Sequence, residues 1–223
     1  MTAPYGPVLV VGASGETGHL VVQLLRQRGI EVRAVVRSEL KAEALSVPGI
    51  GVYIGDVMDE LPWGSLMEGV QGVISTLGTR GTKDLAELEI VEYIVLGRIV
   101  EAALLNNISQ LVFMSSIGTE HPDSIPFLSH VLRVKRKAEM YLIRSRLPYT
   151  IVRPGGLVND PPLNAVQVGR GDTLQGRITR ADVAQVLVQA LLQPEAINQV
   201  VEVINREGAG AADRPGLFKI TNN

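Results

Sequence analysis

The residues best suited to chemistry form a glycine-rich segment near the N-terminus: Gly12, Ala13, Ser14, Gly15, Glu16, Thr17 and Gly18. This segment follows an apolar run at residues 8–11 and opens a stretch with helical apolar spacing. In such a turn the first glycine bends the chain out of the strand, the second lets the backbone approach a pyrophosphate, and the third lets the helix pack against the sheet. Amide groups at the helix start favour the phosphates of a dinucleotide. The alternative is a tight turn that binds no ligand.

The second apolar run predicts which dinucleotide is preferred. An NAD site usually places an Asp or Glu at the carboxyl end of this strand, where it binds the ribose 2′-hydroxyl. Here the run ends in Arg37 and Ser38, and Glu31 stands at its beginning. A guanidinium makes charge-assisted hydrogen bonds to a phosphate, and a serine hydroxyl adds a further contact. The sequence therefore favours NADP(H) over NAD(H), unless Arg37 is an ordinary solvated surface charge.

Further polar residues follow the third and fourth apolar runs. Ligands of open α/β sheets bind outside the carboxyl ends of the strands. Asp56 and Val57 follow the third run, and the Asp56 carboxylate could accept a hydrogen bond from the adenine amino group. Thr76, Leu77 and Gly78 follow the fourth run and could face the ribose region of the cofactor. The alternatives are that Asp56 caps a helix and that Thr76 simply ends a strand.

These residues need a scaffold of buried strands and amphipathic helices, and the apolar pattern supplies both. Apolar, largely β-branched runs occupy residues 8–11, 32–36, 50–54, 72–76, 111–114, 150–152 and 200–204. Helical stripes lie within 20–25, 88–102 and 183–191. Nearly continuous apolar strands are typical of a sheet that helices cover on both faces. The alternation predicts an α/β fold, namely a single-domain, Rossmann-type, doubly wound parallel sheet of about six or seven strands.

Two segments lack this periodicity. Residues 155–176 are rich in Gly, Pro and Asn, and we expect a long, functional loop over the open edge of the sheet. Residues 207–223 have no apolar anchors before Leu217 and Phe218, which predicts a mobile or loosely docked tail. The expected organisation is one dinucleotide-binding domain at 1–206, followed by a C-terminal tail at 207–223.

Composition excludes several classes of protein. The chain has 223 residues, of which 46% are hydrophobic, so it can bury a sizeable core. A formal net charge of −2 argues against nucleic acid as a partner, and the absence of cysteine excludes disulfides and thiol catalysis. His19, His121 and His130 are too scattered to predict a metal site. No secretory signal and no membrane span is expected, which makes the cytoplasm the default location.

A family resemblance rests on seven segments that occur in this order: GASGETG, VRAVVRS, GDV, VISTLG, VFMSSIG, VKRKAEMYLIRSRLPYTIVRPGGL and ITRADVAQVLVQALL. Together they resemble the atypical short-chain dehydrogenase/reductase family, in particular its NmrA-like, NAD(P)-binding subgroup, over roughly residues 7–205. This subgroup includes small plant and cyanobacterial proteins and relatives of flavin and biliverdin reductases. The resemblance implies that one turn lies beside the nicotinamide, formed by Pro154, Gly155, Gly156 and Leu157.

The catalytic residues typical of short-chain dehydrogenases are incomplete. Those enzymes use a Tyr with a Lys four residues later, a spacing that places both on one helical face. None of the five tyrosines has a Lys at that spacing. The remaining candidates are Ser115 or Ser116, which could bind a substrate carbonyl, and Lys137, which the resemblance places at the nicotinamide ribose. Alternatively, the serines satisfy backbone groups at a strand end, and Lys137 belongs to a solvated basic face at 133–137.

The sequence therefore leaves two functional interpretations. One is an NADPH-dependent oxidoreductase whose small planar acceptor, a flavin or quinone, takes its proton from water. His121 or His130 could instead act as the acid, although both are also ordinary surface residues. The other interpretation is a catalytically silent NADP(H) sensor or assembly factor that presents the bound cofactor to a protein partner.

Overall fold

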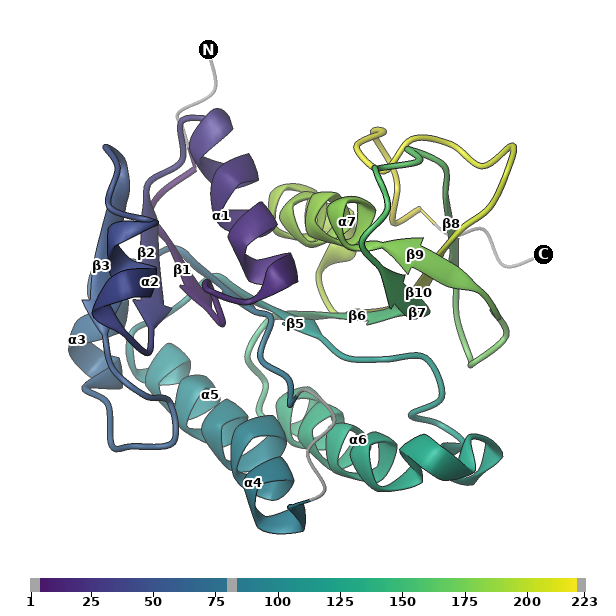
Figure 1. Cartoon of the computed structure of the whole chain (residues 1–223), viewed down its shortest axis with the longest axis horizontal. Helices are drawn as coiled ribbons and strands as arrows, with labels where there is room; N and C mark the ends of the chain where they lie inside the picture. The colour runs from purple at the N-terminus through teal and green to yellow at the C-terminus, as the bar shows by residue number, and fades with distance from the viewer. Residues whose placement is uncertain (1–4, 80–83, 220–223) are drawn as a thin grey trace.

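The computed structural model describes residues 5–79 and 84–219, in which strands alternate with helices (Figure 1). Eight strands form one sheet, in which neighbouring strands run parallel except for the last pair. Their spatial order is β3 (Ile50–Ile54), β2 (Val32–Val36), β1 (Val8–Val11), β4 (Gly72–Ser75), β5 (Gln110–Met114), β6 (Tyr149–Pro154), β10 (Gln199–Asn205) and β8 (Val166–Gly169). This order is the doubly wound arrangement expected of a Rossmann-type fold.

Helices cover both faces of the sheet, as Figure 1 shows. The upper layer consists of α1 (Glu16–Gln27), α2 (Glu39–Glu43) and α7 (Arg180–Leu192). The lower layer consists of α3 (Trp63–Met67), α4 (Leu85–Glu89), a π-helical turn (Ile90–Ile94), α5 (Val95–Leu105) and α6 (Ser129–Arg144). Short 3₁₀ turns occupy Pro122–Ser124, Pro126–Leu128 and Pro194–Ala196.

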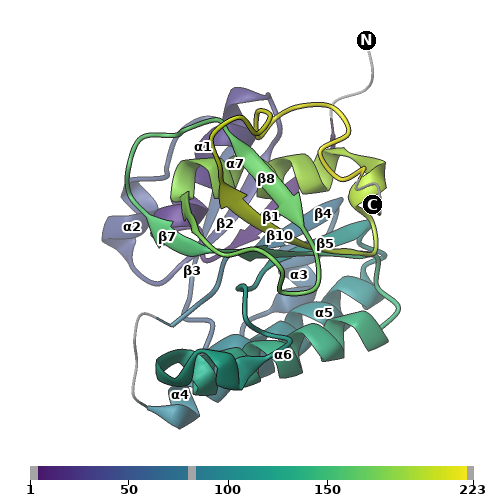
Figure 2. The ribbon, with the colours of Figure 1, turned by 90° about the vertical axis from the view of Figure 1, so that its right-hand side faces the viewer.

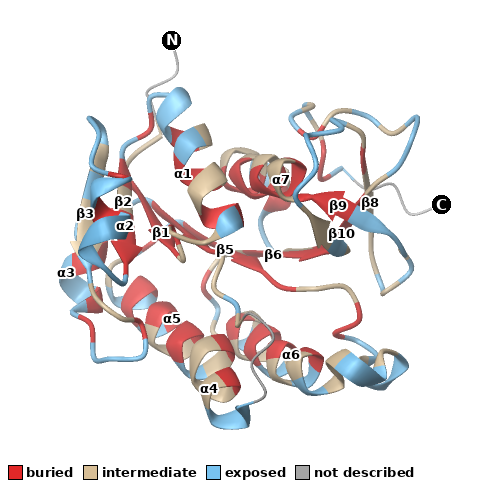
Figure 3. Cartoon of the chain, viewed as in Figure 1, coloured by how far each residue is buried: buried red, intermediate tan, exposed pale blue. Residues whose placement is uncertain are grey.

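The alternating side chains of each strand build two cores, one against each helical layer (Figure 3). In β1, Val8 and Val10 join the core beneath α1 and α7, whereas Leu9 and Val11 join the core above α5 and α6. All four side chains of β1 are fully buried. The sheet needs apolar residues on both faces for this reason, and the prediction of a sheet covered on both sides is confirmed.

The predicted loop at 155–176 is wrong in part. It contains β7 (Gly156–Val158) and β8, and β7 pairs with β9 (Arg177–Thr179) in a separate two-stranded sheet. Strand β8 pairs antiparallel with β10 and extends the main sheet to eight strands, beyond the six or seven expected (Figure 2). Such short, partly polar strands leave little periodic signal, because pairing with a neighbour rather than burial defines them.

The C-terminal segment also differs from the expected loose tail. Ala212, Leu217 and Phe218 are buried in the same core as α7. The Arg214 guanidinium donates to the carbonyl oxygens of Val166 at 3.1 Å and of Gly210 at 2.8 Å. The two anchors noted in the sequence are therefore sufficient to dock the segment as far as residue 219.

Two classes of site find no support in the described part of the chain. None of its helices has the length and apolar character needed to cross a bilayer. No group of three or more acidic or histidine side chains is arranged there to hold a metal ion.

Candidate functional site

The glycine-rich turn between β1 and α1 has the geometry that a diphosphate requires. Gly12 adopts a φ of +84°, in the left-handed region that favours glycine. The amide of Gly15 donates to the Gly12 carbonyl at 2.9 Å, and Gly15 is the N-cap of α1. A side chain on Gly18 would place its Cβ 2.1 Å from the Gly12 oxygen. The three glycines thus keep the turn tight and leave the first amides of α1 accessible to an anion.

The Gly18→Ala substitution is expected to destabilise the protein and to abolish dinucleotide binding. Its Cβ would also lie 2.7 Å from Thr76 Oγ1, so helix and sheet must separate. Thermal unfolding and a cofactor titration measure the two effects. The control is Gly64→Ala in α3, where nothing lies within 4 Å of the added Cβ. This control should be neutral or slightly stabilising, and equal behaviour of the two variants would contradict the argument.

A cavity of about 620 Å³ opens beside this turn, along the carboxyl ends of β1, β2, β3 and β4. Ten of the predicted cofactor residues line it: Gly12, Ser14, Gly15, Arg37, Ser38, Asp56, Val57, Thr76, Leu77 and Gly78. It also contacts residues that the sequence did not single out: Val35, Lys41, Gly55, Met58, Thr79, Glu87 and Val91. Both its size and the glycine cradle fit a bound nucleotide.

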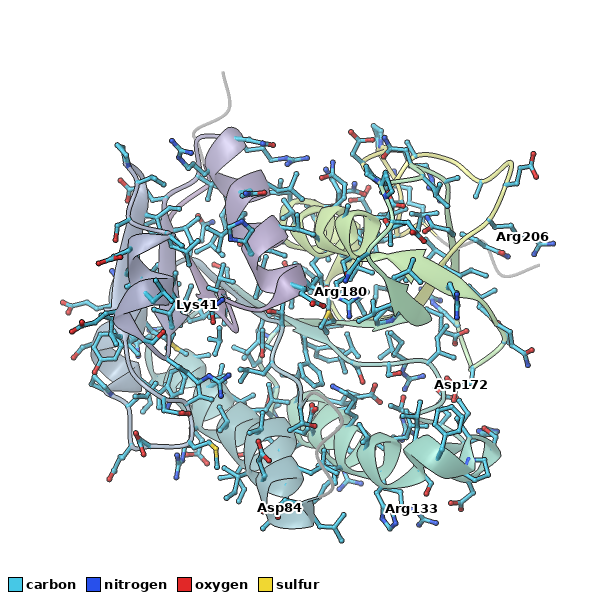
Figure 4. The ribbon with its side chains drawn as sticks, viewed as in Figure 1. Lys41, Asp84, Arg133, Asp172, Arg180 and Arg206 are labelled. Atoms are coloured by element: carbon cyan, nitrogen blue, oxygen red, sulfur yellow. The ribbon has the colours of Figure 1, made fainter. Side chains whose placement is uncertain are left out.

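Basic side chains gather at the adenosine end of the cavity. Arg37 follows β2, and Lys41 lies one helical turn further on, in α2. Within the described residues neither cation has an ion-pair partner, and Ser38 makes no side-chain capping bond. Figure 4 shows Lys41 between the β2–β3 side of the sheet and α1. Two cations and a hydroxyl at one cavity wall suit a 2′-phosphate.

Asp56 and Thr76 have structural contacts in addition to their place in the cavity wall. Asp56 Oδ1 accepts the Met58 amide at 3.0 Å, which stabilises a local turn rather than a helix. Thr76 Oγ1 donates to the carbonyl oxygens of Val11 at 3.3 Å and Gly12 at 3.2 Å. The Thr76 contacts fix the end of β4 against the glycine-rich turn, and the Asp56 contact holds the turn that follows β3.

The carboxyl end of β5 carries a buried hydroxyl without a partner. Ser115 is 4% exposed, and its Oγ has no hydrogen bond to any of the described residues. Ser115 follows Phe113 by two positions, so both side chains are on the face toward α5 and α6. The neighbouring Ser116 Oγ instead donates to the Ile117 carbonyl at 3.0 Å. A buried polar atom of this kind requires an explanation, and Ser75 on the neighbouring strand β4 carries a second buried hydroxyl without a partner among the described residues.

The two lysines of α6 occupy different faces of the helix. Lys137, the predicted lysine, pairs with Glu89 on the outer surface, and its ammonium lies 3.9 Å from the centre of the Tyr93 ring. It does not line the cavity beside the glycine-rich turn. Lys135 is instead buried against the sheet: its Nζ donates to Glu92 at 2.7 Å and lies 5.7 Å from the Phe113 ring centre. The structure therefore places Lys137 on the outer surface and Lys135 in the interior, and neither lysine lines the cavity.

A second buried ion-pair network stands at the carboxyl end of β6. The Arg153 guanidinium donates to both oxygens of Glu139, at 2.9 and 2.8 Å, and to Glu120 at 2.7 Å. Burial alone would lower the pKa of Arg153, but the hydrogen bonds and charges of Glu139 and Glu120 raise it above its ordinary value. Asp172, labelled in Figure 4 on the β8–β9 connection, accepts the amides of Gly118 at 2.9 Å and Glu120 at 2.8 Å. The network joins the loops that follow β5 and β8.

The remaining predicted residues do not line the cavity. Ala13, Thr17 and Gly18 are buried in the turn, and Glu16 pairs with Arg180 at 2.9 Å. The predicted turn after β6 lies near β9: the Gly156 amide donates to the Gly176 carbonyl at 3.0 Å. Outside this cavity are Ala13, Glu16, Thr17, Gly18, Ser115, Lys137, Pro154, Gly155, Gly156 and Leu157.

The comparisons with known proteins assign the family. A family model described as NAD(P)H-binding matches residues 12–194, so the chain belongs to this NAD(P)H-binding family of atypical short-chain dehydrogenase/reductases. The glycine-rich turn and the Rossmann-type sheet are the parts of the structure that this membership explains.

Several relatives share most of the chain. It is 35% identical to an uncharacterized chloroplastic protein of Arabidopsis thaliana, over 95% of this chain and 81% of that protein. It is 31% identical to sanguinarine reductase of Eschscholzia californica, over 93% of this chain and 92% of that enzyme. It is also 27% identical to the photosystem II assembly factor Ycf39 of Trieres chinensis, over 90% of this chain and 64% of that protein.

Solved structures give the same picture. A "Putative NAD-dependent epimerase/dehydratase" from Bacillus halodurans superposes with a TM-score of 0.87 at 28% identity, covering 96% of this chain and 98% of that one. ChuY, an anaerobilin reductase from Escherichia coli O157:H7, superposes with a TM-score of 0.77 at 27% identity, covering 92% and 100%. The relatives thus include reductases as well as proteins that are not described as enzymes.

Proposed function

We propose that the chain is an NADPH-dependent reductase of a small planar acceptor of the flavin or quinone type. The observation that carries this proposal is the unpartnered, buried hydroxyl of Ser115, which follows β5 on the face against which Lys135 of α6 packs. The adjacent strand β4 leads into Thr76–Thr79, which borders the cavity beside the glycine-rich turn. A hydrogen-bond donor thus stands one strand away from the candidate cofactor cavity.

The cofactor preference rests on the charges at the adenosine end. Arg37 and Lys41 would bind the 2′-phosphate with Ser38, and the first amides of α1 would bind the diphosphate. When bound, the nicotinamide supplies the hydride, and the protein supplies orientation and electrostatics. In this proposal Lys135, rather than Lys137, would contact the second ribose. These residues support NADPH rather than NADH as the reductant.

The absence of the usual tyrosine limits the acceptor. Val131 stands four residues before Lys135, where a Tyr would otherwise donate the proton. In its place the Ser115 hydroxyl would donate a hydrogen bond to an acceptor oxygen and orient it. An acceptor that takes its proton from water needs no stronger acid, as a flavin or quinone does. The reductases among the relatives, named for sanguinarine and anaerobilin, support this class.

The test is steady-state oxidation of NADPH, followed by its absorbance, with flavins, quinones, sanguinarine and anaerobilin as acceptors. With the accepted substrate, Ser115→Ala should lower kcat by about 10- to 100-fold and leave the affinity for NADPH almost unchanged. Ser116→Ala is the matched control, because its hydroxyl is bound to the Ile117 carbonyl. Equal activity of both variants would remove the role given to Ser115.

The second candidate function is a silent NADP(H) sensor or assembly factor that acts on a protein partner. Val131 at the tyrosine position favours it, and one relative is described as a photosystem II assembly factor. Tight binding of NADPH without reduction of any acceptor in the panel would support this candidate and overturn the reductase proposal.

A further inference from the structure

A buried glutamate joins the cofactor cavity to Lys135. Glu92 is 2% exposed and divides its carboxylate between two partners. Oε1 accepts the Thr79 amide at 2.9 Å and the Thr79 hydroxyl at 3.4 Å, and Oε2 accepts Lys135 Nζ at 2.7 Å. Thr79 borders the cavity, whereas Lys135 lies beneath the carboxyl half of β5. One side chain therefore holds both the cavity wall and the buried ammonium.

The local backbone aims Glu92 inward. Residues Ile90–Ile94 form a π-helical turn between α4 and α5, and Glu92 is its central residue. Such turns interrupt the regular hydrogen-bond ladder and are frequent at functional sites. The neighbouring Glu89 belongs to the preceding α-helical turn and pairs with Lys137 on the outer surface, where their side chains are 34% and 50% exposed. The same stretch thus presents one glutamate–lysine pair to the interior and one to solvent.

Stability alone does not explain the inner pair. Two charges must lose their hydration to form it, and well-packed apolar residues often serve stability equally well. Yet the Glu92 carboxylate accepts bonds from two segments, and one of them borders the cavity. An apolar residue at position 92 could neither accept the hydrogen bonds of Thr79 nor pair with the ammonium of Lys135. The arrangement is therefore suited to setting the positions of two groups relative to each other.

We propose that Glu92 is a positioning residue, which orients Lys135 toward the second ribose of the dinucleotide and fixes the Thr79 segment against it. This inference rests on the proposed binding of NADPH and adds to it the group through which Lys135 is placed. Glu92 does not touch the cofactor through its own carboxylate, because it is buried and does not line the cavity. Its effect should therefore be confined to ligands that carry the second ribose.

The test compares three ligands by calorimetry: 2′,5′-ADP, which lacks the second ribose; 2′-phospho-ADP-ribose, which has it; and NADPH. In Glu92→Gln, binding of NADPH and 2′-phospho-ADP-ribose should weaken by about tenfold or more, because a charged hydrogen bond that orients Lys135 is lost. Binding of 2′,5′-ADP should be unchanged. Glu89→Gln removes the same charge from the outer pair and should change none of the three affinities.

Two further variants separate a positioning role of Glu92 from a general loss of folding. Glu92→Asp retains the charge and should recover part of the affinity for the two larger ligands. If Glu92→Gln fails to fold, the pair Glu92→Gln with Lys135→Met removes the unpaired buried ammonium, and it should fold yet still bind NADPH weakly and 2′,5′-ADP normally. Equal weakening for all three ligands, or none, would overturn the positioning role while NADPH binding by the wild type stands. A wild-type chain that binds no NADPH would overturn both proposals.

Discussion

The double variant Arg37→Glu/Lys41→Glu is expected to bind NADPH about 100-fold or more weakly than the wild type, with little change for NADH. Each charged contact to a phosphate contributes roughly 1.5–3 kcal/mol, and about 1.4 kcal/mol corresponds to a tenfold change in affinity. Both side chains border the same end of the cavity, and the introduced carboxylates would repel the 2′-phosphate. Calorimetric titration with NADPH and NADH measures the two affinities in parallel.

The control for this experiment reverses the charge of an exposed cation that lies outside the cavity. Arg206 lies at the opposite side of the molecule, after β10, and contacts Gln167 at 3.1 Å (Figure 4). Arg206→Glu should leave both affinities unchanged, because exposed charges beyond about 10 Å are largely screened at moderate salt. Equal losses for NADPH and NADH in the double variant would show that the two cations serve the fold and not the 2′-phosphate.

The glycine-rich turn could be predicted because its constraints are local. Gly12 requires a positive φ, and Gly18 has no room for a Cβ; both facts follow from neighbours within the same strand–turn–helix unit. The inner strands could be predicted equally well, since β1, β2, β4, β5, β6 and most of β10 are buried by helices and leave nearly continuous apolar runs, whereas the edge strand β3 is only partly buried. The place of Lys41 in the cavity wall could not be predicted in this way. It depends on where α2 begins, because that helix places Lys41 beside the part of the wall that Arg37 also lines.

Which of Lys135 and Lys137 is buried depends on the register of α6. Residues two positions apart point to nearly opposite sides of an α-helix. Leu132, Ala138 and Leu142 form the buried stripe of α6, and Lys135 falls on that stripe at a spacing of three from two of them. A lysine on an apolar stripe is a signal of a buried, paired charge that the sequence already contained.

The partners of Glu92 and the existence of strand β8 could not be predicted from the local sequence. Glu92 lies four residues after the buried Leu88 and three before the buried Val95, so helical spacing already places it on the inner face, but no local pattern identifies Lys135 and Thr79 as its partners. Strand β8 exists through antiparallel pairing with β10, a contact between segments that no local pattern connects. Both features arise from tertiary contacts rather than from local propensity.

The largest loss of stability is expected from Arg153→Met. Arg153 is 1% exposed and satisfies the fully buried Glu139, so its removal leaves a negative charge in the interior with only Thr119 and the partly exposed Arg136 as partners. Breaking a buried pair in this way costs about 3–5 kcal/mol, which for a domain of this size lowers Tm by on the order of 10 °C. Thermal unfolding followed by circular dichroism measures the shift.

Matched variants separate charge from packing in this network. Arg136→Met removes a single, longer contact to Glu139 of 3.4 Å and should lower Tm only slightly. The pair Glu139→Leu/Arg153→Met removes both buried charges and should recover much of the lost stability. If Arg153→Met alone matches the wild type, the buried pair of Arg153 and Glu139 does not stabilise the fold. The Arg153 network would then not hold together the loops after β5 and β8.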